Sequence, residues 1–116
     1  MPPETPSPFA RNSLIPLAGE GWIDDVPGIR AQETESGGRR WAVVEYATGA
    51  RRAEWCLDGH AGFVLDGQIE YEFSDGDPPL VVSAGDAFTL ATGRGHRGRN
   101  LHHGSSRLFL IDDPTP

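Results

Sequence analysis

The sequence predicts a small all-β protein, and three features of the residue pattern carry this prediction. Apolar and polar residues alternate in residues 40–47, 68–73 and 107–111, which is typical of strands with one face in solvent. Turn signals built on glycine separate such stretches about every ten residues. No long segment carries an apolar stripe of helical period. Short strands joined by close turns are typical of a β-sandwich or barrel, and the hairpin-rich order fits a double-stranded β-helix, the jelly-roll barrel.

The expected strands follow from this pattern in chain order. They cover residues 29–34, 40–47, 51–57, 61–66, 68–74, 79–83, 86–90, 95–101 and 106–112. The pair Asp66-Gly67 joins two of them, because Asp-Gly favours the positive φ of a tight hairpin turn. Residues 1–13 are rich in proline, which fixes φ and lacks an N–H donor, so an extended N-terminal arm is expected there. Residues 14–112 then form a single barrel domain, since 116 residues are too few for two cores.

Composition and charge exclude several classes of function. The 10 basic residues are outnumbered by 17 acidic ones, and the net charge of −7 opposes binding to a nucleic acid. No apolar run approaches the ~20 residues of a membrane span, and the N-terminus lacks the basic start and apolar run of a signal peptide. The single cysteine, Cys56, has no partner for an internal disulfide, which favours a reducing compartment. We expect a cytoplasmic protein that binds neither nucleic acid nor membrane.

One spaced motif stands near the C-terminal end of the chain. Its residues are Gly85, Ala91, Gly93, His96 and Asn100. The motif resembles the second conserved motif of the cupin superfamily, which reads glycine, five residues, usually proline, one residue, glycine, two residues, histidine, three residues, asparagine. Every interval matches, and alanine replaces the usual proline. Strand alternation sends Arg97 and Arg99 to the face opposite the histidine.

A second stretch has the spacing of the first cupin motif, in which His-x-His, three residues, Glu, six residues and Gly occur in order. Here Glu54 and Cys56 stand at the two histidine positions, His60 stands at the glutamate position, and Gly67 ends the motif in register. The resemblance implies a small β-barrel with a metal or ligand site inside it. Its candidate metal ligands are Glu54, Cys56, His60 and His96.

The chemistry of these four side chains constrains what they hold. A buried polar group without a partner costs ~1–3 kcal/mol, so the four must be satisfied by one another, by water or by a metal. Thiolate with imidazole favours zinc or iron(II), whereas Glu54 with two histidines suits iron(II), manganese or nickel. Four protein ligands on zinc make a closed site, and three leave a position for substrate. Two alternatives stay open: Glu54 as an unligated general base, and Cys56 as a small buried hydrophobe.

The resemblance implies a small single-domain cupin that binds a divalent metal and a small organic molecule in the barrel. Cupin enzymes include dioxygenases, isomerases, epimerases and decarboxylases, and the sequence does not select among them or establish catalysis. The alternative is a non-catalytic metabolite-binding or sensor cupin without metal. We also expect a homodimer, because small cupins often pair through sheet edges or exchange terminal strands, and the N-terminal arm is long enough to reach a partner.

Overall fold

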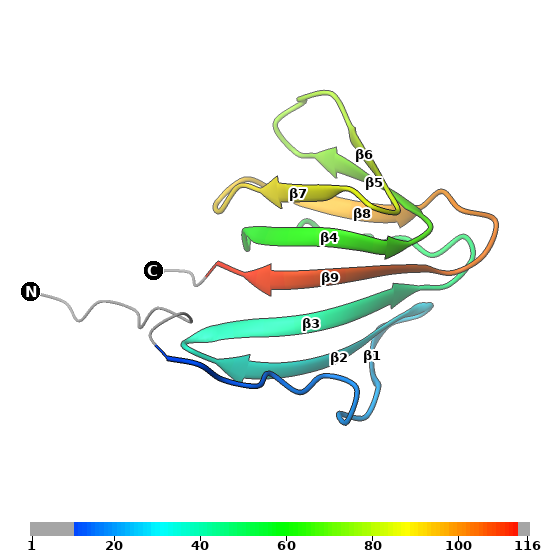
Figure 1. Ribbon diagram of the computed structural model, residues 1–116. Helices are drawn as coiled ribbons and strands as arrows, with labels where there is room; N and C mark the ends of the chain where they lie inside the picture. Colours follow the sequence, from blue (N-terminus) through cyan, green and yellow to red (C-terminus); the bar gives the residue numbers. More distant parts are fainter. Residues whose placement is uncertain (1–10, 114–116) are drawn as a thin grey trace, which may run out of the picture.

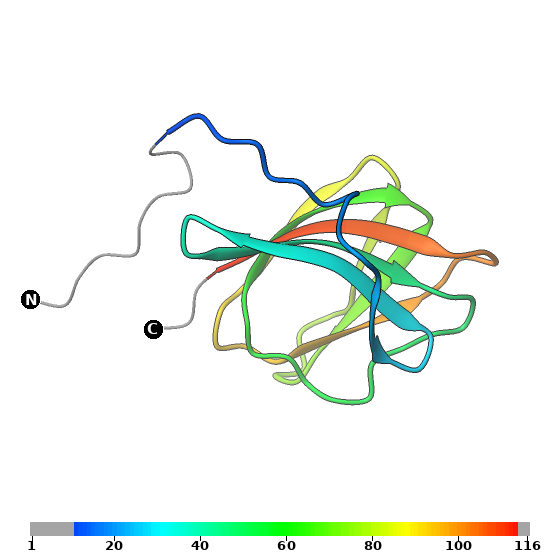
Figure 2. The same ribbon diagram turned by 90° about the horizontal axis from the view of Figure 1, so that it is seen from below.

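The computed structural model describes residues 11–113, and these form an all-β jelly-roll barrel, which confirms the predicted fold class. A six-stranded antiparallel sheet has the order β1-β2-β3-β9-β4-β7, and a three-stranded sheet has the order β6-β5-β8. The strands are β1 (Ile23–Val26), β2 (Ile29–Ser36), β3 (Arg39–Tyr46), β4 (His60–Asp66), β5 (Gln68–Phe73), β6 (Leu80–Ser83), β7 (Ala87–Leu90), β8 (His96–Asn100) and β9 (Ser106–Asp112). Figure 1 shows β9 between β3 and β4, and Figure 2 shows the two sheets around a common interior.

Two expectations from the sequence concern the N-terminal arm and a membrane span. Residues 1–10, most of the expected N-terminal arm, lie outside the described residues. From residue 11 to residue 113 there is no helix that is long and apolar enough to cross a membrane.

The interior between the sheets is apolar because alternate residues of each strand face it. In β3, Val44 and Ala42 are buried, and they lie opposite the buried Leu108 and Leu110 of β9. Ile69 of β5 closes this core from the smaller sheet and is fully buried. Burying a side chain such as Val, Leu or Ile stabilises the fold by about 1.5–3 kcal/mol. The alternation read from the sequence is therefore the pattern that assembles the barrel.

The prediction of a strand over residues 51–57 is wrong. Only Arg51 and Cys56 make isolated bridges to β8, to Arg99 and His96 respectively. Between the two bridges this segment advances by five residues, whereas β8 advances by three. The residues between the bridges therefore loop out of register with β8. A short edge strand, β1, was not predicted, because its sequence Ile-Asp-Asp-Val lacks apolar alternation and its residues are mostly exposed.

The expected hairpin turn at Asp66-Gly67 is confirmed, since it joins β4 to β5. Gly67 has a φ of +84°, a conformation that disfavours other residues. A Cβ at this position would collide with the side chain and backbone of Ser106 at the start of β9. Gly67 is thus required both by the turn and by the close approach of β9.

Asn100, the last residue of the second motif, joins the loop after β3 to the loop between β8 and β9 and to the first residue of β9. Its Nδ2 donates to the carbonyl oxygens of Ala47 at 2.9 Å and Gly104 at 2.8 Å. Its Oδ1 accepts hydrogen bonds from the His102 backbone N–H at 2.9 Å and the Ser106 hydroxyl at 2.7 Å. The side chain is buried, so these contacts replace those it would make with water. Asn100 therefore has a structural role at the end of the barrel away from the candidate ligands.

Candidate metal centre

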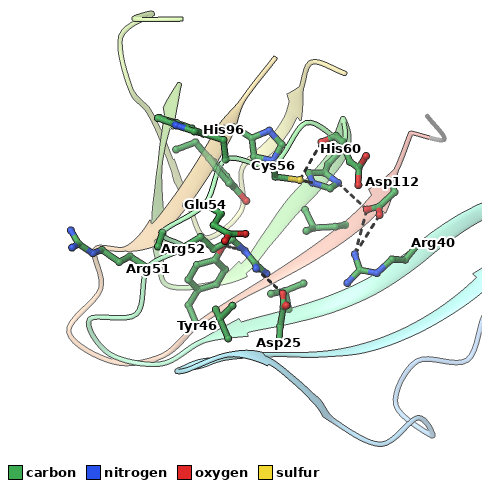
Figure 3. A pocket seen from close by; sticks show the side chains of 18 of the residues that line it. Asp25, Arg40, Tyr46, Arg51, Arg52, Glu54, Cys56, His60, His96 and Asp112 are labelled. Atoms are coloured by element: carbon green, nitrogen blue, oxygen red, sulfur yellow. Dashed lines mark hydrogen bonds and ion pairs between the residues drawn. The ribbon is translucent and has the colours of Figure 1, made fainter. Parts of the chain in front are cut away.

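Three of the predicted ligands come together in the barrel interior. Cys56, His60 and His96 each offer one ligand atom, and these atoms all lie within 4.8 Å of one another. His60 is the first residue of β4 in the larger sheet, and His96 is the first residue of β8 in the smaller one. Figure 3 shows the thiol of Cys56 beside both imidazole rings. The cluster thus bridges the two sheets at one end of the barrel.

The backbone fixes Cys56 and His96 against each other. The Cys56 N–H donates to the His96 carbonyl oxygen at 2.8 Å, and the His96 N–H donates to the Cys56 carbonyl oxygen at 3.0 Å. This paired bridge holds the segment before β4 against the first residue of β8. His96 is buried, and its ring meets the His60 ring edge to face at a centroid distance of 5.1 Å. The three side chains converge although their segment of chain is not a strand.

A fourth residue, Asp112, orients His60. The Nδ1 atom of His60 lies 2.8 Å from Oδ1 of Asp112, and the two residues are register partners on β4 and β9. The other ring nitrogen, Nε2, lies 3.9 Å from Sγ of Cys56. Asp112 also lies 3.4 Å from Nη1 of Arg40, whose Nε donates to Glu33 at 2.5 Å. The carboxylate therefore takes the Nδ1–H and directs Nε2 into the cluster.

Sequence analysis did not identify Asp112 as part of the site. The available signal was its position two residues after the inward-facing Leu110 at the end of β9, which places a carboxylate on the interior face. Asp112 is next to an identical residue, Asp113, which lies in solvent and accepts a hydrogen bond from Thr92 at 2.5 Å. Alternation sends the two carboxylates to opposite faces, and the pairing of β9 with β4 sets Asp112 beside His60.

The electrostatics of the cluster favour a charged pair when no metal is bound. Contacts with His60 and then His96 lower the pKa of the Cys56 thiol from 9.0 to about 6. Burial on its own lowers the pKa of His60, but the hydrogen bond to Asp112 and the contact with Cys56 outweigh it and raise this pKa to about 9. Near neutral pH the pair is therefore thiolate and imidazolium. A thiolate is the form of cysteine that binds metals.

The fit of a metal to these residues rests on one unsatisfied atom. The Nδ1 atom of His96 is buried and has no hydrogen-bond partner within residues 11–113. Leaving such an atom unpaired costs about 1–3 kcal/mol, and native proteins rarely retain the cost without a reason. Two imidazoles and a thiolate are also a donor set that zinc and iron(II) favour. The residues present therefore fit a divalent metal.

Glu54, the remaining predicted ligand, lies apart from this cluster. It is exposed and lines the same cavity, and Figure 3 shows it at some distance from the thiol of Cys56. Because residues 53–55 are looped out of register with β8, the alternation that would place Glu54 and Cys56 on one face does not operate. Ligation by Glu54 stays a prediction from the motif spacing.

A cavity of about 790 Å³ opens beside the cluster, within the size range of small-molecule sites. Its wall includes the three cluster residues, two tyrosines and three arginines. These last five residues are Tyr46, Tyr71, Arg40, Arg51 and Arg52. Apolar side chains such as Val44 and Leu110 complete the wall. The cavity is large enough for a metal together with a small organic molecule.

The cluster and most of the cavity wall lie within a stretch that matches a known family. A model of the family described as "Cupin domain" matches residues 42–112, which is more than half of the chain and runs from β3 to the last residue of β9. The chain therefore belongs to the cupin superfamily. A search of curated proteins gave no match.

Several solved structures share this fold. KdgF from Halomonas sp. is 21% identical, with a TM-score of 0.69 over 90% of this chain and 96% of that one. An oxalate oxidase is 20% identical, with a TM-score of 0.66 over 83% of this chain and 56% of that one. The iron(II) form of HppE is 14% identical, with a TM-score of 0.70 over 87% of this chain and 60% of that one. At these identities the likeness establishes the fold alone.

Proposed function

We propose that this cupin binds a divalent metal ion through Cys56, His60 and His96, and that the metal and the adjacent cavity together bind a small organic molecule. The observation that carries the proposal is the convergence of three ligand atoms within 4.8 Å of one another beside a cavity of about 790 Å³. Three protein ligands leave at least one coordination position for water or substrate, which is the arrangement of catalytic rather than structural zinc sites.

Zinc and iron(II) are the metals that we propose first. The thiolate of Cys56 and the two imidazoles are softer donors than the oxygen ligands that magnesium and calcium prefer. Participation of Glu54 in place of the thiolate would instead suit iron(II), manganese or nickel. Among the structural neighbours, HppE is described in its iron(II) form and another is an oxalate oxidase, so the barrel accommodates metal-dependent chemistry elsewhere.

The residues of this chain would divide the work of such a site. Cys56, His60 and His96 would hold the metal, which when bound supplies a Lewis acid that polarises a ligand oxygen. Asp112 keeps Nε2 of His60 directed at the cluster. The apolar part of the cavity wall excludes bulk water and so strengthens polar contacts to a bound molecule.

A second candidate function is a metabolite-binding barrel without metal. It is favoured by the contacts that Cys56, His60 and Asp112 already make with one another, since a thiolate, an imidazolium and a carboxylate in contact are partly satisfied without an ion. In that case the cavity alone selects the ligand, and Nδ1 of His96 is left without a partner in the described chain.

Metal analysis of untagged protein, purified without chelator, separates the two candidates. The metal proposal expects close to one equivalent of zinc or iron, or one-site binding on titration of the apo protein. His96→Ala should reduce the bound metal well below one equivalent while the far-ultraviolet spectrum of the barrel is kept. Glu54→Gln serves as the matched variant and should retain the metal if only the three clustered residues are ligands. Wild-type protein that binds no zinc, iron, manganese or nickel would exclude the metal proposal.

Two further expectations belong to the proposal. The outer face of the larger sheet supports a homodimer, because Val43, Phe109 and Phe63 form an apolar row across β3, β9 and β4, and Phe63 is 40% exposed. Light scattering at micromolar concentration should give the mass of a dimer, and a monomer would remove this expectation. The free thiol of Cys56 supports a reducing, cytoplasmic location.

A further inference from the structure

One side of the cavity carries three side chains with hydrogen-bond donors. Arg52 comes from the segment between β3 and β4, Tyr46 ends β3, and Tyr71 lies in the middle of β5. Figure 3 shows Arg52 and Tyr46 together with Asp25, on a different part of the cavity wall from Cys56 and His60. No role in holding the metal accounts for these three side chains.

The side chain of Arg52 is largely buried. Its side chain is 26% exposed, its Nη1 lies 2.6 Å from Oδ2 of Asp25, and its Nε donates to the Tyr46 hydroxyl at 3.3 Å. These contacts leave Nη2 without an acceptor in the part of the chain that the structure describes. A guanidinium presents five N–H donors in a planar fork that matches a carboxylate. Arg52 thus keeps unused donors at a cavity wall.

The two tyrosines add hydroxyl donors beside it. The Tyr46 oxygen accepts from Arg52, so its own hydrogen is free to donate. Tyr71 is 3% exposed and lines the cavity. Burial raises the pKa of both phenols, which therefore stay protonated and remain donors. The Tyr71 ring packs edge to face on His96 at a centroid distance of 5.8 Å, which places it next to the metal cluster.

Gly98 on β8 gives these tyrosines their space. A Cβ at this position would lie 2.9 Å from the Tyr46 hydroxyl oxygen and 3.1 Å from Cε1 of Tyr71. Both phenols therefore reach the same point of the cavity wall, and any larger residue would push one of them away. Gly98 itself lines the cavity.

The acidic residues of the wall use only part of these donors. Asp25 pairs with Arg52 through Nη1 alone, and Asp112 is engaged by His60 and Arg40. Glu54 and Asp58 are exposed. Neither Asp25 nor Asp112 contacts the hydroxyls of Tyr46 and Tyr71, so these hydroxyls and the rest of the Arg52 guanidinium can meet the acceptors of an anion.

We propose that the cavity binds a small organic acid, with its carboxylate on Arg52 and the hydroxyls of Tyr46 and Tyr71, and with a second oxygen of the ligand directed at the Cys56–His60–His96 cluster. The inference rests on the proposed function for the second oxygen, while the carboxylate contact depends only on the cavity. A carboxylate fits better than a phosphate because one free guanidinium nitrogen and two neutral hydroxyls suit two oxygens rather than the three or four of a phosphate.

Calorimetric titration of the full chain with acids and their neutral amides tests this inference. The probes are lactate, malate and citrate, each with its amide, and inorganic phosphate as the rival anion, on both metal-free and metal-loaded protein. At least one acid should bind with an affinity about tenfold or more above that of its amide, since a hydrogen bond to a charged group is stronger than one to a neutral group.

Variants assign the effect to the wall. Arg52→Gln should weaken binding of that acid about tenfold or more, and Tyr71→Phe, which keeps the ring, should weaken it about threefold to tenfold. Arg51→Gln is the matched control, because Arg51 is an exposed arginine at the same cavity, and it should change the affinity less than about threefold. Metal stoichiometry should be unchanged in all three variants. If Arg52→Gln does not fold, Tyr71→Phe carries the comparison.

The outcomes separate this inference from the proposed function. Metal binding with equal affinities for acids and amides overturns the carboxylate site and leaves the metal site standing. Absence of metal binding together with an Arg52-dependent preference for an acid overturns the metal site only. Binding of none of the acids, tighter binding of phosphate, or equal effects of Arg51→Gln and Arg52→Gln overturns the inference.

Discussion

Replacement of Asp112 by asparagine tests the metal centre through a residue that does not touch the metal. The carboxylate lies 2.8 Å from Nδ1 of His60 and has two opposing effects on metal binding. It orients the ring and makes Nε2 a better donor, and loss of such a partner typically weakens metal binding about 10–100-fold. It also stabilises the imidazolium, so that a proton competes with the metal for Nε2.

The pKa of His60 sets the size of the second effect. With this pKa at about 9, proton competition at pH 7 weakens metal binding by the wild-type protein about 100-fold, because the difference is two pH units. In Asp112→Asn the imidazole loses its main stabilising partner, and its pKa falls from about 9 toward the ordinary value of about 6.5. The two effects therefore largely cancel at pH 7. At pH 9, where competition is nearly gone, the variant should bind metal about 10–100-fold more weakly than the wild type.

The assay is zinc titration in competition with a chromophoric chelator at both pH values. Asp113→Asn is the control, because it removes the same charge one residue further along, where the carboxylate contacts Thr92 and Arg39 instead of His60. Its zinc affinity should stay within about threefold of the wild type. Equal affinities of the two variants at pH 9 would refute the role of Asp112, and a ratio that does not change with pH would refute the raised pKa of His60.

Three other measurements follow from the same structure. In wild-type protein, metal affinity should rise about tenfold per pH unit between pH 6 and pH 9, because the thiol of Cys56 is already ionised and one proton must leave His60. Below pH 6 the slope should steepen, because the thiol also takes up a proton. A slope near zero between pH 6 and pH 9 would contradict the raised pKa of His60. Cobalt-loaded protein should show a sulfur-to-metal charge-transfer band in the near ultraviolet that is lost in Cys56→Ser, and its absence from fully loaded wild type would remove Cys56 from the ligand set. Asn100→Ala should lower the free energy of unfolding in urea by about 2–3 kcal/mol, because several buried hydrogen bonds are lost. Arg99→Ala removes an exposed ion pair with Glu70 and should lower it by less than about 1 kcal/mol. Similar losses in the two variants would contradict the structural role of Asn100.

Local pattern was sufficient for much of the barrel. Alternation of apolar residues predicted most of the strands, and it correctly sent Arg97 and Arg99 away from His96, since successive side chains of a strand point to opposite faces. The turn at Asp66-Gly67 was equally readable, because φ > 0 is a property of the residue itself. The motif spacing also selected Cys56, His60 and His96, which the structure brings together.

Prediction was weakest where a residue's environment depends on distant strands. Residues 51–57 were predicted to form a strand, but they pair with β8 only through two isolated bridges, at Arg51 and Cys56. Glu54 lies between these bridges and outside the cluster. The donor wall of Arg52, Tyr46 and Tyr71 is assembled from three separate segments, and no local spacing relates them.

Asp112 and Asp113 show most clearly what the sequence determines and what only the tertiary structure determines. The sequence determined that a strand of alternating residues ends in two carboxylates. Alternation along the strand distinguishes the face of Asp112 from that of Asp113, but it does not show which residue the inward carboxylate meets. The pairing of β9 with β4 decided this, since it sets Asp112 beside His60, which lies 52 residues away, and leaves Asp113 at the surface. Cross-strand register depends on the whole sheet, so only the tertiary structure could make that choice.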